Sequence, residues 1–234
     1  MDRTRLTTAG VLLLAGVQYF LAEAITAAAW TRTPYSYGEN YISDLGVPEC
    51  VELGRTVCSP AYLLMDVSLV LQGLLVLTAV IVLGDALRAG RPHRIARMVV
   101  AVLAVVHAIG LIVVGLFPGS FAEAIGGDPV RLFLHSLGAL FAILGGNLLM
   151  VAVAVLAPRE GRPVLALAIA VLAAIGLGAI AAGLLGSDLG LGLGGIERVA
   201  AYPVFAGLFL VGGALIVAGR RSRGTPVSEK PLGR

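Results

Sequence analysis

The stretch Ala61–Leu83, with the sequence AYLLMDVSLVLQGLLVLTAVIVL, decides the fold class of this chain. Its only charged side chain is Asp66, and it reaches the roughly 20 residues that a helix needs to cross a bilayer. Five more stretches share this character: Leu6–Ala29, Ile95–Leu116, Leu132–Ala157, Val164–Leu185 and Val199–Ala218. With a mean hydropathy of +0.95 and only 13% charged residues, the composition excludes an ordinary soluble domain. The sequence therefore predicts an all-α, polytopic transmembrane bundle of six helices.

The basic residues predict how this bundle is oriented. If the N-terminus is cytoplasmic, most of the 17 Lys and Arg residues fall in cytoplasmic segments, and only Arg32, Arg55, Arg131 and Arg198 fall outside. Short cytoplasmic loops carry such an excess of basic residues. We therefore expect a multi-pass protein of the cell membrane with both termini cytoplasmic. The pI of about 9.1 then reflects contact with membrane lipids, and no nucleic-acid partner is expected.

The chain divides into one membrane domain and a tail. The six-helix domain is expected over residues 1–219, with a long extracytoplasmic loop over residues 31–60, and residues 220–234 predict a disordered basic tail. Arg3 and Arg5 before the first apolar run also resemble a signal peptide. That run exceeds the ~7–15 apolar residues of a signal peptide and contains Gln18 and Glu23. We expect the first helix to be retained; cleavage is the alternative and would leave five helices.

The loop over residues 31–60 is longer than most helix connections, which favours a role of its own. It holds several aromatic residues and both cysteines of the chain, Cys50 and Cys58. Two cysteines in one small loop on the oxidising side of a membrane favour a disulfide. Two free thiols are the alternative, and a metal pair is disfavoured because the spacing fits no common zinc pattern.

Small residues predict where the helices pack, since lipid gives no hydrophobic drive between helices. Gly138, Ala142 and Gly146 fall four apart in the fourth stretch, and Gly178 and Ala182 do so in the fifth. We expect both sets to be packing faces. The glycine-rich run over residues 190–195 lacks the strand and helix context of a nucleotide-binding loop and predicts a flexible outer connection.

Polar side chains interrupt the apolar runs toward one end of the predicted bundle. An ionisable group in a membrane costs at least ~2.5–3.5 kcal/mol on insertion scales, so several at one level predict mutual pairing in a cavity. On the predicted topology this set comprises Glu23, Asp66, His107, Arg131, His135, Glu197, Arg198 and Tyr202, with Asn40, Ser43 and Asp44 above it in the loop. The sequence therefore predicts a polar pocket that opens to the outer leaflet.

Three motifs resemble a known family. They are the loop motif Asn40-Tyr41-Ile42-Ser43-Asp44-Leu45-Gly46, then Phe117-Pro118-Gly119 followed by His135, and Glu197-Arg198 followed by Tyr202-Pro203. Together they resemble the membrane family catalogued as domain of unknown function 998, over nearly the whole chain. The resemblance implies a six-helix integral membrane protein and implies no established reaction. Gly119-Ser120 departs from the more polar or acidic turn expected after Phe-Pro.

The pocket suggests an enzyme that acts on a lipid or lipid-linked substrate at the outer leaflet. Histidine titrates near neutral pH, so His135 could serve as a general base oriented by Asp44 or Asp66, which makes these three the candidate catalytic residues. A guanidinium binds phosphate or carboxylate bidentately, so Arg198 with Arg131 could hold an anionic headgroup. The candidate substrate-binding residues are Arg198, Glu197, Arg131, Ser43, Asn40, Tyr202, His107 and Glu23. No metal is predicted, because no ligand set has diagnostic spacing, and the cofactor is unknown.

Other readings of the same residues stay open. Each side chain taken singly fits a structural role, such as capping a turn or pairing two helices. A binding or transport protein would use the pocket for a lipid headgroup or a small anion without reaction. An assembly partner would act through the outer loop, and a homo-oligomer is compatible with all three.

Overall fold

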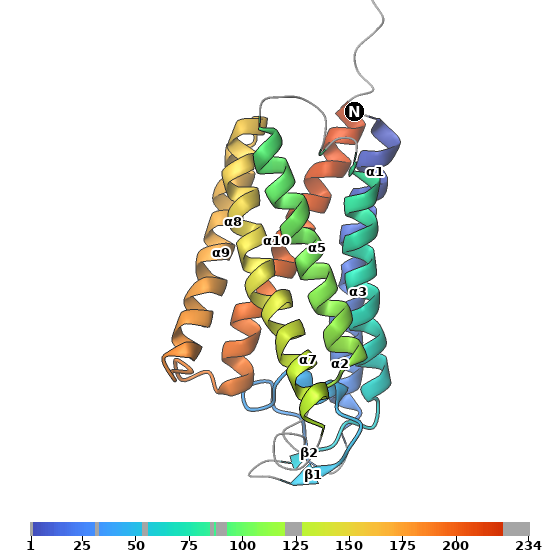
Figure 1. Ribbon diagram of the computed structural model, residues 1–234, viewed down its shortest axis with the longest axis vertical. Helices are drawn as coiled ribbons and strands as arrows, with labels where there is room; N and C mark the ends of the chain where they lie inside the picture. The colour runs from blue at the N-terminus through green and yellow to red at the C-terminus, as the bar shows by residue number, and fades with distance from the viewer. Residues whose placement is uncertain are drawn as a thin grey trace, which may run out of the picture.

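The computed structural model describes residues 2–30, 33–52, 56–84, 87, 93–119 and 128–221. Within this part of the chain, six helices are long and apolar enough to cross a membrane (Figure 1). They span Arg3–Ala28, Tyr62–Val82, Arg94–Leu116, Pro129–Glu160, Pro163–Leu184 and Leu193–Arg221. The predicted all-α class with six spanning helices is thus confirmed.

Two of the spans are composite. The first consists of α1 (Arg3–Leu14), the 3-10 turn η1 (Ala15–Val17) and α2 (Gln18–Ala28). The fourth consists of α7 (Pro129–Leu140), the π-helical segment η3 (Phe141–Gly145), α8 (Gly146–Leu156) and the 3-10 turn η4 (Ala157–Glu160). The other four are continuous helices: α3 (Tyr62–Val82), α5 (Arg94–Leu116), α9 (Pro163–Leu184) and α10 (Leu193–Arg221).

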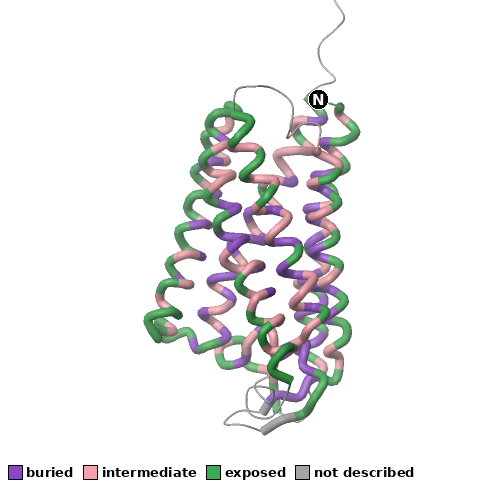
Figure 2. The backbone as a smooth tube through the Cα atoms, in the orientation of Figure 1, coloured by how far each residue is buried: buried purple, intermediate pink, exposed green. Residues whose placement is uncertain are grey.

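The spans follow one another around a closed ring. The first span packs on α3, α3 on α5, α5 on the fourth span, α8 on α9, α9 on α10, and α10 closes the ring against α1. Buried residues line the inward sides of the helices, whereas exposed residues face outward (Figure 2). The outward residues are themselves largely apolar, among them Leu21, Ile95, Val164 and Leu184. An apolar exterior of this extent suits contact with lipid.

Helix α10 begins at Leu193, six residues before the predicted start at Val199. The second half of the expected flexible connection is therefore helical. The outer loop explains this early start, because the N–H of Gly195 donates to the carbonyl of Gly38 (2.9 Å) and Gly194 packs directly on the main chain of Asn40. A side chain at position 194 would collide with that main chain. The predicted tail falls on residues 220–234, of which those after Arg221 lie outside the described residues.

The two predicted packing faces differ. A Cβ at Gly138 would meet Val113 and Val114 of α5, so the small residues of the fourth span form a packing face as predicted. At Gly178 nothing lies within 4 Å, so the prediction for the fifth span is wrong at this position. Gly176, two residues earlier, packs instead against the side chain of Asn147. Spacing alone does not identify which face of an all-apolar helix turns inward.

The outer loop folds back onto the end of the bundle. It contains the 3-10 turn η2 (Ser43–Gly46) and a two-stranded antiparallel hairpin, β1 (Val51–Glu52) and β2 (Thr56–Val57). The predicted disulfide joins Cys50 to Cys58 across this hairpin. Leu45 and Val47 are fully buried, and Ser59 Oγ donates to the carbonyl of Leu45 (2.6 Å). The loop is therefore an integral part of the packed structure.

Candidate functional site

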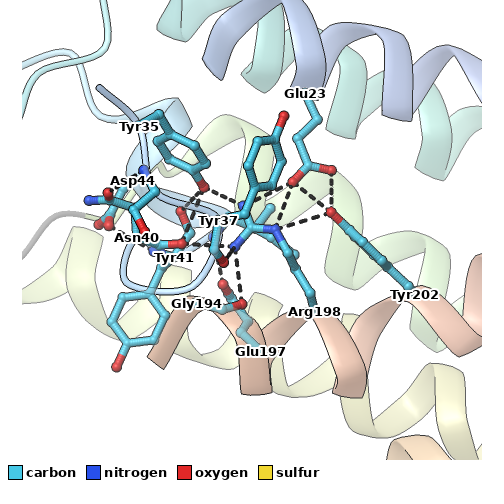
Figure 3. A network of polar contacts seen from close by, with 12 residues as sticks. Glu23, Tyr35, Tyr37, Asn40, Tyr41, Asp44, Gly194, Glu197, Arg198 and Tyr202 are labelled. Carbon is cyan, nitrogen blue, oxygen red and sulfur yellow. Dashed lines mark hydrogen bonds and ion pairs between the residues drawn. The ribbon is translucent and has the colours of Figure 1, made fainter. Parts of the chain in front are cut away.

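Arg198 of α10 forms a buried ion pair with Glu23 of α2 at the loop-bearing end of the bundle (Figure 3). Its Nε and Nη2 donate to Glu23 Oε1 at 3.1 and 2.9 Å. The hydroxyl of Tyr202, one turn further along α10, lies 2.8 Å from both carboxylate oxygens of Glu23 and 3.1 Å from Arg198 Nε. Arg198 is 6% exposed and Glu23 is 2% exposed. A buried pair of this kind is stable only when further hydrogen bonds satisfy both groups, and here they do.

The remaining N–H groups of Arg198 face the outer loop. Nη1 donates to three main-chain carbonyl oxygens, those of Tyr37 (2.9 Å), Asn40 (2.8 Å) and Gly194 (3.0 Å), and Nη2 also donates to the hydroxyl of Tyr35. A guanidinium has five N–H donors. All three nitrogens of Arg198 are thus engaged by acceptors of the protein itself. We call Arg198, Glu23, Tyr202 and the loop residues bound to them the arginine network.

Two loop tyrosines surround the same guanidinium. Its Cζ lies 5.4 Å from the ring centroid of Tyr35 and 4.9 Å from that of Tyr37, within cation–π range. The Tyr35 hydroxyl donates to the carbonyl of Tyr41 (2.8 Å). Burial raises the pKa of Tyr35 well above its ordinary value, although Arg198 opposes that shift. Tyr35 therefore stays protonated and keeps donating to the loop.

The motif over residues 40–46 docks on α10 through its main chain. Glu197 Oε2 accepts from the N–H of Ile42 (2.5 Å), and Asp44 Oδ2 accepts from the N–H of Tyr41 (2.9 Å). Asn40 Oδ1 accepts from the N–H of Ser36 (3.1 Å), which closes the preceding turn. The carboxylate and amide groups of the motif thus hold the shape of the loop.

A cavity of about 50 Å³ lies within the bundle next to the arginine network. Its wall is largely apolar and includes Leu69, Leu111, Val114, Ile143, Val204 and Phe205. Five polar side chains also line it: Tyr19, Ser43, His107, His135 and Glu197. They come from α2, η2, α5, α7 and α10, so every span but α3 and α9 contributes a polar group. We call this space the histidine cavity.

His107 forms the buried side of the histidine cavity and is 1% exposed. Its Nδ1 lies 2.7 Å from the carbonyl oxygen of Ala142, so Nδ1 carries a proton and donates. In the neutral ring Nε2 is then an acceptor, and among the described residues it has no hydrogen-bond partner. Most buried polar atoms in proteins have a partner, so this atom requires an explanation.

The acceptor of the His107 proton lies in the π-helical segment η3, two of whose residues, Ala142 and Ile143, line the histidine cavity. Single π-helical turns inside α-helices are frequent at functional sites. The carbonyl of Ile143 accepts from Nδ2 of Asn147 (2.9 Å), which also donates to Ala200 of α10 (2.8 Å). The side chains of His107 and Asn147 therefore form hydrogen bonds with two carbonyl groups of this irregular turn.

His135 of α7 has the same arrangement at the half-buried edge of the cavity. Its Nδ1 lies 2.9 Å from the carbonyl oxygen of Phe117, so the ring is oriented by a neutral carbonyl where a carboxylate of Asp44 or Asp66 was expected. Nε2 is left as the acceptor atom, as in His107. In both histidines the same ring nitrogen is thus left as the acceptor, and both side chains line one cavity.

Asp66 and Arg131 lie outside both groups. Asp66 of α3 is 7% exposed, its Oδ1 has no hydrogen-bond partner within the described ranges, and Gly46 of η2 packs directly against it. Arg131 donates to the carbonyl of Pro118 (2.8 Å) and to the carboxylate of Glu49 (3.3 and 3.4 Å). Arg131 therefore links the outer loop to the residues that follow α5, and none of these contacts involves Arg198.

The structure separates most of the predicted site residues into two groups. Glu23, Asn40, Arg198 and Tyr202 belong to the arginine network, whereas Ser43, His107, His135 and Glu197 line the histidine cavity. Sequence reasoning gave no role to Tyr19, which lines the cavity and stacks on Phe205 with ring centroids 4.3 Å apart. Tyr19 lies four residues before Glu23 and therefore on the same helical face, and this spacing could have indicated that it faces the polar site. In the described ranges no group of three or more His, Cys, Asp or Glu residues could hold a metal ion.

Comparison with known proteins supports the motif resemblance. The model of a family described as "Protein of unknown function (DUF998)" matches residues 6–214. The chain belongs to this family. No curated protein and no solved structure matches it. It is therefore a multi-pass membrane protein of the DUF998 family.

Proposed function

We propose that this DUF998 protein binds the hydrogen-bond-donating end of a lipid or lipid-linked molecule in the histidine cavity. The observation that carries the proposal is the buried Nε2 of His107, an acceptor without a partner among the described residues. Leaving such an atom buried and unsatisfied costs about 1–3 kcal/mol. A ligand that donates a hydrogen bond to Nε2 removes this cost. Binding such a ligand would explain why a histidine, and not an apolar residue, occupies position 107.

The chemistry of the cavity selects the kind of ligand. Nε2 of His107, Nε2 of His135 and the carboxylate of Glu197 are all acceptors, and only the hydroxyls of Tyr19 and Ser43 can also donate. A ligand must therefore bring N–H or O–H groups. A primary ammonium suits this set best, because it has three donors and the carboxylate attracts its charge in a low dielectric. A phosphate or carboxylate would be repelled.

The size of the cavity restricts what enters. A water molecule needs about 10–15 Å³ of such volume, so about 50 Å³ holds a few waters or one small polar group. The rest of the ligand must lie outside the cavity. Its edge consists of the half-buried residues Ser43, His135 and Glu197, whereas Tyr19 and His107 form the buried side. An amphiphile with its head in the cavity and its chains among the helices and lipid fits this shape.

We also propose that the cavity lies toward the outer leaflet and that both termini are cytoplasmic. Arg94, Arg97, Arg159, Arg162 and Arg220 lie at or beyond the helix ends opposite the outer loop. An excess of basic residues at one end is typical of the cytoplasmic side. The disulfide in the loop at the other end agrees with an oxidising compartment there.

In this proposal Arg198 is a structural residue. Its donors are all directed at Glu23, Tyr202, the loop and the first turn of α10, so an anionic headgroup could bind it only after breaking a buried ion pair. Breaking a buried pair costs about 3–5 kcal/mol. The acceptor-rich cavity next to it has no comparable cost to overcome.

The test compares two lipids that differ in donors and not in net charge. Protein in nanodiscs of equal parts phosphatidylethanolamine and phosphatidylcholine is released and examined by native mass spectrometry. We expect phosphatidylethanolamine, whose ammonium donates, to be retained about tenfold over phosphatidylcholine, which has no donor. A charge-assisted hydrogen bond contributes about 1.5–3 kcal/mol, and about 1.4 kcal/mol is tenfold.

Two variants locate the effect. Asparagine carries its N–H group on Cγ, as histidine carries Nδ1, so His107→Asn and His135→Asn keep a donor toward the carbonyls of Ala142 and Phe117. Both variants lose Nε2, and the remaining acceptor Oδ1 is attached directly to Cγ and does not reach the position of Nε2. Each should abolish the preference. The control is His93→Asn, which changes an exposed histidine at the start of α5. Equal retention of the two lipids by the wild type, or a preference that survives both cavity variants, would refute the proposal.

A further inference from the structure

Two adjoining hollows lie at the other end of the bundle, where α1 begins and α10 ends. The first, of about 260 Å³, lies between α1, α5, α8, α9 and α10, and its wall is mostly leucine and valine. The second is a groove on the outside of the molecule between the start of α9 and the end of α10. Arg162, Leu165 and Ala218 line both, so the groove and the inner hollow share a wall. This end is distant from the histidine cavity and carries different chemistry.

The arginines here differ in their partners. Arg97 is bound by Glu160, with Nη2 and Nε at 2.7 and 3.1 Å from Oε1. Arg162 is half-buried where the two hollows meet, and within the described part of the chain its guanidinium has no hydrogen bond or ion pair. Arg221 lines the same groove from α10. The lining of the groove therefore combines two guanidinium groups with exposed apolar side chains that include Val164 and Val217.

We propose that this groove binds one anionic phospholipid, with its phosphodiester on Arg162 and Arg221 and an acyl chain along Val164, Leu165 and Val217. Guanidinium groups bind phosphate oxygens through paired, charge-assisted hydrogen bonds. Basic pockets between spanning helices bind lipid headgroups in this way. Free phosphate would bind the arginines and leave the apolar side chains uncovered, so the combination of positive charge and apolar lining selects an amphiphile.

The site is independent of the proposed function, because it recognises negative charge where the histidine cavity recognises donors. A lipid that separates the two is phosphatidylmethanol, which has an anionic phosphodiester and no N–H or O–H donor. Protein in phosphatidylcholine nanodiscs with increasing fractions of phosphatidylmethanol is examined by native mass spectrometry. We expect one anionic lipid to be retained specifically. Arg162→Gln and Arg221→Gln should each weaken retention about fivefold, since a basic residue near the surface contributes about 1 kcal/mol.

Arg159→Gln is the matched control. It removes the same charge three residues before Arg162, but Arg159 is exposed, lines neither hollow and donates to the carbonyl of Val155. We expect it to retain the lipid as the wild type does, and thermal unfolding curves check that all variants are folded. An equal loss with Arg159→Gln, no loss with either groove variant, or displacement of the lipid by millimolar inorganic phosphate would each overturn the assignment.

Discussion

The arginine network and the histidine cavity lie side by side at one end of the bundle and share both α10 and the outer loop, yet they are opposite in character. In the network the guanidinium and carboxylate are fully engaged by protein groups. In the cavity a fully buried ring nitrogen of His107 has no partner among the described residues. Polar groups that only stabilise a fold tend to be satisfied within it, whereas an unsatisfied acceptor beside a cavity is available to water or to a ligand that donates a hydrogen bond.

Two consecutive residues create this difference. Glu197 and Arg198 point about 100° apart around α10, as neighbours in a helix of 3.6 residues per turn must. Glu197 therefore reaches the cavity and the motif, while Arg198 turns to Glu23. A change at either position should act on one region and spare the other.

The largest effect is expected when the arginine network is broken. Arg198→Met leaves the carboxylate of Glu23 buried without its charge partner and removes the guanidinium donor from the loop carbonyls of Tyr37 and Asn40 and from the carbonyl of Gly194 in α10. We expect the free energy of unfolding to fall by about 3–5 kcal/mol, as for other buried pairs that lose one member. Denaturant titration in detergent, followed by circular dichroism, measures the change.

The double variant Glu23→Gln, Arg198→Met sharpens this result. It removes the stranded charge, so it should regain part of the stability that Arg198→Met loses, and the coupling appears as non-additivity. Additive losses would mean that the ion pair contributes nothing as a pair, and the contrast between the two regions would then lose its basis.

The sequence predicted the charged and polar side chains of the arginine network but not the main-chain carbonyl groups that complete it. The cost of ionisable groups in a membrane singled out Glu23, Arg198 and Tyr202. What closes the network is the main chain of residues 37, 40 and 194, and carbonyl groups are the same in every residue type. An arginine near a polar pocket therefore looked available for a headgroup. The early start of α10 at Leu193, which delivers one of these carbonyls, went unpredicted because glycine runs usually end helices.

A smaller effect is expected at the loop side of the network. Tyr35→Phe removes the hydroxyl that donates to the carbonyl of Tyr41 and accepts from Arg198 but keeps the ring beside Trp30. Hydrogen bonds to charged groups contribute about 1.5–3 kcal/mol and neutral ones about 1 kcal/mol, so a loss of about 2 kcal/mol follows. Tyr37→Phe is the control, because Tyr37 acts through its ring and its carbonyl. A Tyr37→Phe loss as large as that of Tyr35→Phe would contradict the assignment of these bonds.

The histidines were found from sequence for the same reason as the arginine, but their tautomers could not be. Which ring nitrogen stays available depends on the carbonyls of Ala142 and Phe117, and the first of these lies in a π-helical turn. No residue pattern in an apolar stretch marks such a turn. For the same reason the sequence did not predict that the carbonyl of Phe117 orients His135, and a carboxylate was expected instead.

The smallest effect on stability, and the one that separates the two regions most sharply, is expected from His107→Leu. The substitution removes a buried acceptor that has no partner among the described residues, together with one donor to the carbonyl of Ala142, which also accepts from the N–H of Gly146. Replacing an unsatisfied polar group by an apolar one of similar size is often neutral or stabilising. We expect the unfolding free energy to change by less than about 1 kcal/mol in either direction, while the lipid preference is lost. A residue kept for binding should show this separation, because sites held ready for a ligand are commonly less stable than they could be. A loss as large as that of Arg198→Met would instead make His107 a structural residue, and the cavity would then be a second part of the same framework.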